Sequence, residues 1–440
     1  MTNYFRALWY FYSLNSRSRW SFDKLSTYQT KRLRALVGYT YDHVRFYHDQ
    51  FKKSGIRPAD IQSIKDLNKL PVTGKNDVRV NLDSMISREY DVKQLKMRST
   101  SGSTGKPLFF YVSQSELEFR KAKHLRANMS CGQKPFDRWI TLTSPHHFAE
   151  STRLQNLMHF YMPRPISVLE NVSRQISLTE QMKPDVLDGY SSALLILAKE
   201  MEKTGTGKGI KPRFIIGGAE LIDDCSRKFV EQTLQAPFYD QYSSVEMERM
   251  AWQCQLKQGY HIDSDALVIQ FLDKNGDEVS ANECGEVVCT SLFSYAMPFI
   301  RYAIGDMGRP SDERCECGRP FPLMKMIEGR KDSLLFLPDG RMVTPRSFTI
   351  PMTSFKFYSL IDQFQIVQKK IDLFTFTIKM KEPDFDPDTF EKELLKHYAE
   401  LLKLNLDDVE IKIQFVDDIP LDQSGKLMAV TSNLTQVGKT

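Results

Sequence analysis

The sequence lacks the long apolar run of about 18 residues that a membrane-spanning helix requires. Its aromatic start, from Met1 to Tyr10, is broken by Arg6, and no small-residue cleavage site follows it, so we expect a cytoplasmic protein without stable membrane insertion. Charge of one sign is not in strong excess either. Lys and Arg total 60 against 55 for Asp and Glu, and a net charge of +5 is too small to predict nucleic acid as a partner.

Cysteine is sparse and odd in number, with seven residues spread over a chain of 440. Such a count predicts thiols or metal ligands rather than a disulfide framework. Cys254 and His261 share one short stretch, and Cys315 and Cys317 form a later knuckle-like turn. Three thiolates and one imidazole complete a closed tetrahedral shell, so we expect structural Zn²⁺ at these four residues. Their Cys-x-Cys spacing is tighter than the usual Cys-x₂-Cys, and the alternative is four unliganded side chains.

The composition is that of an ordinary globular protein, with 41% hydrophobic and 26% charged residues. The first hundred residues read mostly as helix, notably residues 27–51. From Met97 onward, short β-rich runs alternate with helical stretches, which is typical of an α/β sheet domain. The runs are Leu108 to Val112, Trp139 to Leu142, Phe214 to Ile216, Ala266 to Leu272 and Gly285 to Thr290, and the helices are Ser115 to Met129 and Ser191 to Lys203.

The pattern changes near Asp332. A hairpin around Asp339-Gly340 comes first, and the segments after it read strand, strand, helix, strand. These segments are residues 363–369, 373–379, 388–402 and 409–415. We therefore predict an α/β fold with a large multi-sheet domain over residues 1–331 and a small α+β domain over residues 332–440.

A hydroxyl-rich loop precedes the first of these strands. It reads Thr100-Ser101-Gly102-Ser103-Thr104-Gly105-Lys106. Its glycines let the backbone approach a polyphosphate, its hydroxyls donate hydrogen bonds, and Lys106 adds a positive charge. It is not a Walker A loop, because Thr100 stands where that motif has glycine and Pro107 where it has Ser or Thr. The alternative is a flexible Ser/Gly turn between strands.

Further motifs follow this loop in a fixed order. They are Ile216-Gly217-Gly218-Ala219-Glu220, Tyr239-Asp240-Gln241-Tyr242-Ser243-Ser244-Val245-Glu246, Pro298-Phe299-Ile300-Arg301-Tyr302-Ala303-Ile304-Gly305-Asp306, Gly329-Arg330-Lys331-Asp332 and Pro420-Leu421-Asp422-Gln423-Ser424-Gly425-Lys426. With them the whole chain resembles the phenylacetate-CoA ligase branch of the adenylate-forming enzymes. That branch also includes adenylation proteins of capsule biosynthesis and ligases that join an acid to an amine.

The resemblance implies a role for each motif. Gly218, Ala219 and Glu220 would lie beside the adenine, and Tyr242 would pack against it, with Ser244 in the same segment. Glu246 would hold Mg²⁺ against the phosphates, as suits a hard cation that prefers oxygen ligands. Asp306 would accept hydrogen bonds from the ribose hydroxyls, and Arg330 would contact the nucleotide.

The same resemblance implies a mobile C-terminal domain. Asp332 would be the hinge, and Lys426 would bridge the acid's carboxylate and the α-phosphate as negative charge develops. Some members of the branch carry a structural zinc at positions matching the Cys/His group. Two departures stand in the Tyr242 motif, where Ser243 replaces the usual Gly and Val245 the usual hydroxyl residue.

The predicted activity is ATP-dependent conversion of a small carboxylic acid to an acyl-adenylate, with release of pyrophosphate and transfer of the acyl group to coenzyme A. One alternative is an acid-amine ligase that forms an amide with an amino acid or amino sugar, and another is loading of a carrier protein. A nucleotide-binding homologue without turnover is the alternative from a different class, and Ser243 and Val245 are the features that favour it.

Overall fold

The computed structural model describes residues 3–100, 108–145, 148, 155, 157, 159–219, 222, 224–326, 335–343, 345–382, 385–419 and 430–434. These residues form two compact units. The first unit takes its residues from Met1–Ser99, Leu108–Lys134 and Tyr239–Gly329. The second takes them from Thr100–Pro107, Pro135–Phe238 and Arg330–Thr440.

The first unit joins N-terminal helices to an antiparallel sheet. Its helices are α1 (Tyr4–Arg17), α2 (Phe22–His43), α3 (Arg45–Lys53), α4 (Lys75–Val80), α5 (Leu82–Met85) and α6 (Gln114–Ser130). Its strands are β1 (Lys96–Ser99), β2 (Phe109–Val112), β7 (Phe238–Ser244), β8 (Glu248–Trp252), β9 (Tyr260–Ile262), β10 (Leu267–Leu272), β11 (Gly285–Ser291), β12 (Tyr302–Pro310) and β13 (Leu323–Met326). Short 3₁₀ turns span Pro58–Asp60, Lys65–Lys69 and Val92–Gln94.

The strands of this unit follow the order β10-β11-β12-β13-β9-β8-β7, and β1 pairs with β2 separately. The helical stretch predicted over residues 27–51 proves to be two helices, α2 and α3, because Val44 adopts an extended conformation between them.

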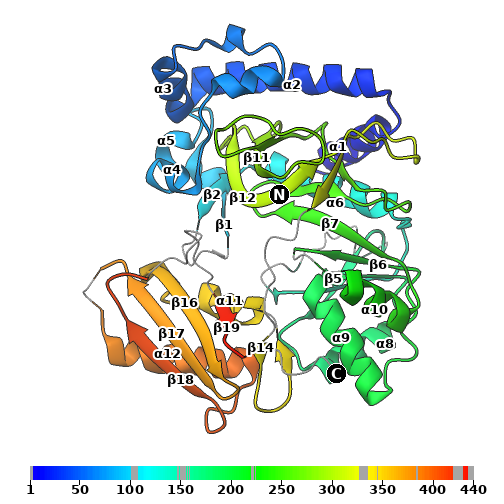
Figure 1. Ribbon diagram of the computed structural model, residues 1–440, viewed down its shortest axis with the longest axis vertical. Coiled ribbons are helices and arrows are strands. Elements are labelled where there is room, and N and C mark those ends of the chain that lie inside the picture. The colour runs from blue at the N-terminus through cyan, green and yellow to red at the C-terminus, as the bar shows by residue number, and fades with distance from the viewer. Residues whose placement is uncertain are drawn as a thin grey trace. The chain divides into compact units, whose positions relative to one another are not determined.

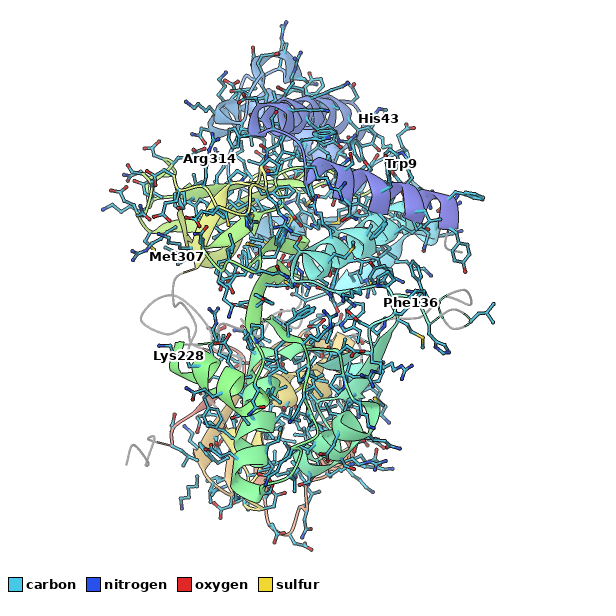
Figure 2. The ribbon with its side chains drawn as sticks, turned by 90° about the vertical axis from the view of Figure 1, so that its right-hand side faces the viewer. Trp9, His43, Phe136, Lys228, Met307 and Arg314 are labelled. Carbon is cyan, nitrogen blue, oxygen red and sulfur yellow. The ribbon has the colours of Figure 1, made fainter. Side chains whose placement is uncertain are left out.

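Helix α1 packs along α6, where Tyr10 meets Phe119 edge-on. The other side of α1 carries Trp9, which is 60% exposed (Figure 2).

The second unit begins with a parallel α/β sheet, as the alternation of strands and helices predicts. Its strands are β3 (Trp139–Thr143), β4 (Pro163–Ser167), β5 (Val186–Tyr190) and β6 (Phe214–Gly218), in the order β4-β3-β5-β6. Its helices are α8 (Val172–Met182), α9 (Ser191–Thr204) and α10 (Asp224–Leu234). Ile140, Leu187 and Ile215 of the strands and Leu194 of α9 form its core.

The C-terminal part of this unit has its own core. Its elements are β14 (Leu335–Phe336), β15 (Met342–Val343), α11 (Pro345–Ser354), a 3₁₀ turn at Tyr358–Leu360, β16 (Ile361–Lys370), β17 (Leu373–Met380), α12 (Pro387–Leu402), β18 (Glu410–Phe415) and β19 (Val430–Ser432). The sheet runs β18-β17-β16-β19, with α12 beside it (Figure 1). The ring of Tyr398 on α12 packs against that of Phe376 on β17. The strand, strand, helix, strand order is confirmed.

The predicted fold class is confirmed: the chain is α/β, with a large sheet and a smaller C-terminal domain. Helix α11 was not predicted, because Pro351 within it reads as a helix breaker. The predicted boundary at residues 331 and 332 lies outside the described residues and stays a prediction. None of the helices described here is long and apolar enough to cross a membrane.

A buried ion network ties α1, α6 and the β9–β10 connection together. Arg126 of α6 is fully buried and donates hydrogen bonds to Asp263 and Asp265. Arg17 of α1 donates to Asp265 as well, at 2.7 Å. Burial alone would raise the pKa of Asp265, but Arg126 and Arg17 bring it down to about 2. The network is stable only as a set, because each buried charge depends on its partners.

We predict that Arg126→Met lowers the free energy of unfolding of the first unit by about 3–5 kcal/mol, because it leaves two buried carboxylates without their main cation. Denaturant unfolding followed by tryptophan fluorescence measures the loss. Arg45→Met is the control, since Arg45 pairs with Asp49 at 3.9 Å with most of its side chain in solvent. An Arg126→Met midpoint equal to that of the control would contradict the role given to the network.

Candidate active site and metal cluster

Glu246 lies in the turn between β7 and β8 and is only 3% exposed. Its side-chain Oε1 accepts a hydrogen bond from the Tyr302 hydroxyl at 2.7 Å. Ser244 Oγ accepts from the backbone N–H of Met247 at 3.1 Å, so this hydroxyl closes the turn. The predicted metal ligand is therefore a buried carboxylate with a fixed direction.

Two cations of α6 hold the backbone of the same turn. Arg120 donates to the carbonyl oxygens of Val245 at 2.9 Å and Glu246 at 2.5 Å. Lys123 donates to the next carbonyl, that of Met247, at 2.9 Å. Burial lowers the pKa of Lys123 to about 8, which leaves most of it protonated at neutral pH. Three successive carbonyls of one tight turn are thus fixed by buried positive charge.

Tyr242 and Asp306 meet in the same unit. The Tyr242 hydroxyl donates to Asp306 Oδ2 at 2.9 Å, and burial raises the pKa of this phenol well above its usual value, so it stays a donor. Asp306 follows Gly305, whose φ is +87°, at a bulge where β12 loses register with β11. Bulges turn side chains out of the regular strand alternation and occur beside functional sites. Asp306 keeps acceptor capacity for a ribose diol.

The Gly-Gly motif ends β6 in the second unit. A side chain at Gly217 would overlap the ring of Phe238, since a Cβ there would lie 2.0 Å from Cζ, so this glycine is required by packing. Ala219 follows Gly218 with a φ of +67°, a left-handed conformation that costs a non-glycine residue free energy. Such strain at the end of a buried strand marks this turn as a candidate for ligand binding.

Several predicted site residues lie outside the described residues: Ser101 to Lys106, Glu220, Arg330, Asp332 and Lys426. Thr100 is described and directly follows β1. The segment of the motif that is not described thus falls, in the sequence, between the paired strands β1 and β2. The roles of these residues remain predictions.

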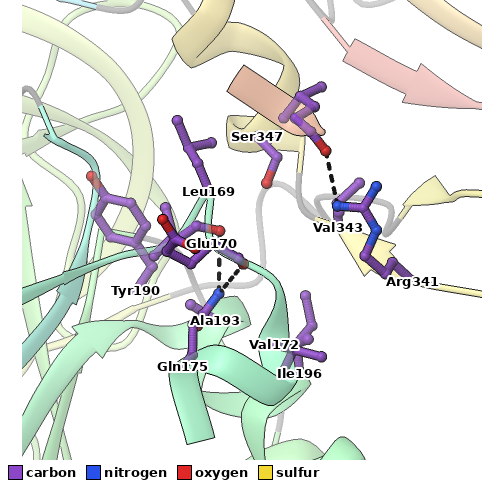
Figure 3. Close-up of a pocket in the computed structure, with 12 residues that line it drawn as sticks. Leu169, Glu170, Val172, Gln175, Tyr190, Ala193, Ile196, Arg341, Val343 and Ser347 are labelled. Atoms are coloured by element: carbon purple, nitrogen blue, oxygen red, sulfur yellow. Dashed lines mark hydrogen bonds between the residues drawn. The ribbon is translucent and has the colours of Figure 1, made fainter. Parts of the chain in front are cut away.

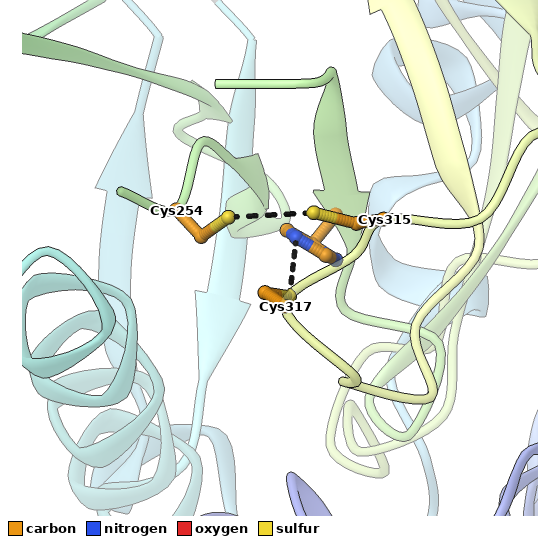
Figure 4. Close-up of side chains that lie close together, drawn as sticks. Cys254, Cys315 and Cys317 are labelled. Carbon is orange, nitrogen blue, oxygen red and sulfur yellow. Dashed lines mark hydrogen bonds between the residues drawn. The ribbon is translucent and has the colours of Figure 1, made fainter. Parts of the chain in front are cut away.

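The structure brings the four predicted zinc ligands together. Their ligand atoms all lie within 4.8 Å of one another, with Cys254 Sγ 3.6 Å from Cys315 Sγ and Cys317 Sγ 3.5 Å from His261 Nε2 (Figure 4). A tetrahedron with metal–sulfur bonds of about 2.3 Å has edges of about 3.8 Å, so the set fits Zn²⁺. Burial lowers the pKa of His261 to about 4, which keeps the imidazole neutral and able to bind a metal.

Strand pairing explains this convergence. Cys254 follows β8, His261 lies on β9, and Cys315 and Cys317 precede β13. Because β9 pairs with both β8 and β13, segments about sixty residues apart meet at one point. The ring centroid of Trp252 lies 4.8 Å from that of His261, so the indole packs beside this imidazole.

A cavity of about 40 Å³ lies in the second unit (Figure 3). Leu169 and Glu170 of the β4–α8 connection line it, together with Arg341 and Leu402 of the C-terminal part. Lys403, next to this wall, pairs with Glu170 at 2.7 Å. A volume of this size holds a few water molecules but no nucleotide, so the cavity is not the predicted ATP site.

Sequence reasoning missed Tyr302, Arg120 and Lys123. Tyr302 stands inside a quoted motif, but nothing in its residue type shows that it faces Glu246. Arg120 and Lys123 are three residues apart on one helix face, a spacing that normally marks a solvated charged stripe. The sequence signal that could have indicated their burial is the apolar residue directly before each of them, Phe119 before Arg120 and Ala122 before Lys123.

Comparison with known proteins supports the predicted relationship. Residues 335–433 match the CapK C-terminal domain. The chain is 25% identical to a phenylacetate-coenzyme A ligase of Thermus thermophilus over 375 residues, which covers 82% of this chain and 83% of the relative. It is 23% identical to Protein CapK of Staphylococcus aureus over 427 residues, covering 92% and 89%.

Solved structures give the fold. A 2-hydroxyisobutyryl-CoA ligase bound to 2-HIB-AMP and CoA matches with a TM-score of 0.64 and 18% identity, covering 95% of this chain and 92% of that one. The same ligase in its postadenylation state matches with a TM-score of 0.63. The chain is thus related to the phenylacetate-coenzyme A ligases and CapK, and its fold is that of the adenylate-forming acyl-CoA ligases.

Proposed function

We propose that this protein is an AMP-forming carboxylate ligase, which activates a small carboxylic acid with ATP and passes the acyl group to coenzyme A. One relative named above is a phenylacetate-coenzyme A ligase, and the similar solved structure, a 2-hydroxyisobutyryl-CoA ligase, carries 2-HIB-AMP and CoA. One observation in this chain carries the proposal. Glu246 and Asp306, at positions that match the resembled motifs, are each held by a buried tyrosine hydroxyl.

These residues would bind and orient the nucleotide. Asp306 accepts hydrogen bonds from the ribose hydroxyls, and Tyr242 fixes one of its oxygens. The hydroxyls and backbone of the loop from Thr100 to Lys106 hold the phosphates. Glu246 would hold Mg²⁺, which would supply positive charge at the phosphates, and a carboxylate is an oxygen ligand of the kind that this hard cation prefers.

The reaction then needs no general base, because the acid is already ionised at neutral pH. A carboxylate oxygen forms a bond to the α-phosphorus, and the bond from that phosphorus to the pyrophosphate oxygen breaks. Lys426 approaches the developing charge in this step. In the second step the acceptor thiol attacks the acyl carbonyl, AMP leaves, and the thiol proton passes to solvent. An amine acceptor would follow the same course and form an amide.

We also propose that Cys254, His261, Cys315 and Cys317 bind one structural Zn²⁺. All four ligand positions of a tetrahedral shell are filled by protein, so no position is left for substrate. The cluster joins the β8–β9 connection to the segment before β13 and sits on a small core around Trp252 and Phe321. The metal would therefore contribute to folding rather than to the reaction.

We predict acid-dependent exchange of labelled pyrophosphate into ATP with a suitable member of a panel of aryl, fatty and amino acids. Glu246→Gln should reduce this exchange by about 10²–10³-fold, the loss typical of removing one group that stabilises transition-state charge. Glu248→Gln, a neighbouring carboxylate paired with His124 instead, is the matched control and should exchange at close to the parental rate.

Exchange by no acid in the panel, with ATP still bound, would favour the nucleotide-binding homologue without turnover. Products formed with coenzyme A and with an amine are then compared for the acid that works. A thioester supports the proposal, and an amide alone favours the acid-amine ligase.

We predict one zinc per chain in protein purified without added metal, measured by elemental analysis. Cys315→Ser should lose the metal and melt at a lower temperature, because a ligand of a closed shell is gone. Cys284→Ser is the control, since Cys284 is exposed and outside the cluster. Metal-free wild-type protein with unchanged thermal stability would falsify the zinc assignment.

A further inference from the structure

Tyr302 forms a hydrogen bond with one of the two carboxylate oxygens of Glu246. It is fully buried at the start of β12, and its hydroxyl donates to Glu246 Oε1. Because a carboxylate oxygen can only accept, the phenol is the donor of this 2.7 Å hydrogen bond.

The backbone around Tyr302 is fixed from both sides. Arg301 has a φ of +45°, and its buried guanidinium donates to the carbonyls of Leu67 at 3.2 Å and Leu70 at 2.5 Å. Thr73 exchanges backbone hydrogen bonds with Arg301 and Ala303 on either side of the tyrosine. The phenol cannot easily move away when a ligand arrives at Glu246.

The carboxylate itself is equally fixed, because Arg120 and Lys123 hold the carbonyls of its turn. Its second oxygen, Oε2, makes no hydrogen bond with any residue in the described part of the chain. A cation at this carboxylate therefore meets one oxygen without a hydrogen bond and one that already accepts from the phenol.

We propose that Tyr302 restricts Glu246 to binding a metal ion through a single oxygen and thereby makes the site selective for Mg²⁺ over Ca²⁺. This inference rests on the proposed function, in which Glu246 holds the metal of the ATP complex. Mg²⁺ takes near-octahedral coordination at about 2.0–2.1 Å with few carboxylate contacts, whereas Ca²⁺ takes six to eight oxygens and readily accepts both oxygens of one carboxylate. Because one oxygen of Glu246 already accepts a hydrogen bond, the carboxylate suits Mg²⁺, which can bind through the other oxygen alone. Ca²⁺ is disfavoured, because the contact with both oxygens that it favours would compete with the Tyr302 hydrogen bond.

The test is an equilibrium binding measurement that needs no turnover. The affinity of the protein for α,β-methylene-ATP, which cannot react at the α-phosphorus, is measured by calorimetry in saturating Mg²⁺ and in saturating Ca²⁺. Wild-type protein should bind it more tightly with Mg²⁺. Tyr302→Phe keeps the ring and removes the hydroxyl, so the Mg²⁺/Ca²⁺ affinity ratio should fall about tenfold, mainly through tighter binding with Ca²⁺.

Tyr242→Phe is the matched control, because it removes a buried phenol hydroxyl that also bonds a carboxylate, that of Asp306. It should weaken nucleotide binding by the same factor with both ions and leave the ratio unchanged. An equal change in the ratio for the two variants, or no change in Tyr302→Phe, would overturn the inference.

Glu246→Gln tests the same idea without altering Tyr302. Its amide oxygen can accept from the phenol, and the amide nitrogen then stands where Oε2 stood, so the dependence of nucleotide affinity on the divalent ion should disappear. Retained Mg²⁺ preference in this variant would contradict the inference. Wild-type affinity that is independent of divalent ions would overturn the inference and the metal role of Glu246 together, whereas a wild-type preference for Mg²⁺ with an unaltered Tyr302→Phe ratio overturns the inference alone.

Discussion

Buried charge on one helix organises the first unit of this protein. The side of α6 that faces the core carries Arg120, Lys123 and Arg126, all less than a tenth exposed. The first two hold the turn that presents Glu246, and the third holds the aspartates that follow His261 of the metal cluster. Charges buried in this way are costly alone and are retained where each is fully paired. The candidate Mg²⁺ ligand and the candidate Zn²⁺ ligands therefore depend on the same helix, although the first is proposed to act in nucleotide binding and the second in folding.

The two carboxylates of the candidate nucleotide site are fixed by the same device, a buried phenol that remains protonated. Tyr242 orients Asp306, and Tyr302 orients Glu246. Preorganised groups lower a barrier because they need not rearrange when charge develops. The departures at Ser243 and Val245 leave this arrangement intact, since Arg120 takes the Val245 backbone carbonyl and Ser244 supplies the hydroxyl that closes the turn. Residue types that differ from the resembled motif are thus compatible with a rigid site.

The sequence was sufficient for the features that depend on local pattern. Alternating strands and helices, the hairpin at Asp339-Gly340 and the grouping of the four Cys/His residues follow from periodicity, turn chemistry and residue type. Features set by tertiary packing were missed. Val44 divides one helical pattern into two helices, α11 contains a proline, and Tyr302 meets Glu246, 56 residues away in the sequence, only in the folded chain. A charged stripe such as that of α6 has the same local signature whether it is solvated or buried.

The most direct test of the account follows oxygen atoms through the reaction. The acid that supports pyrophosphate exchange is supplied with ¹⁸O in its carboxylate, together with ATP, Mg²⁺ and the acceptor, and the AMP is analysed by mass spectrometry. If the carboxylate attacks the α-phosphorus, one labelled oxygen stays on the phosphate of AMP when the acyl group is transferred. Label-free AMP, or label found in a phosphate released with ADP, would contradict an acyl-adenylate intermediate.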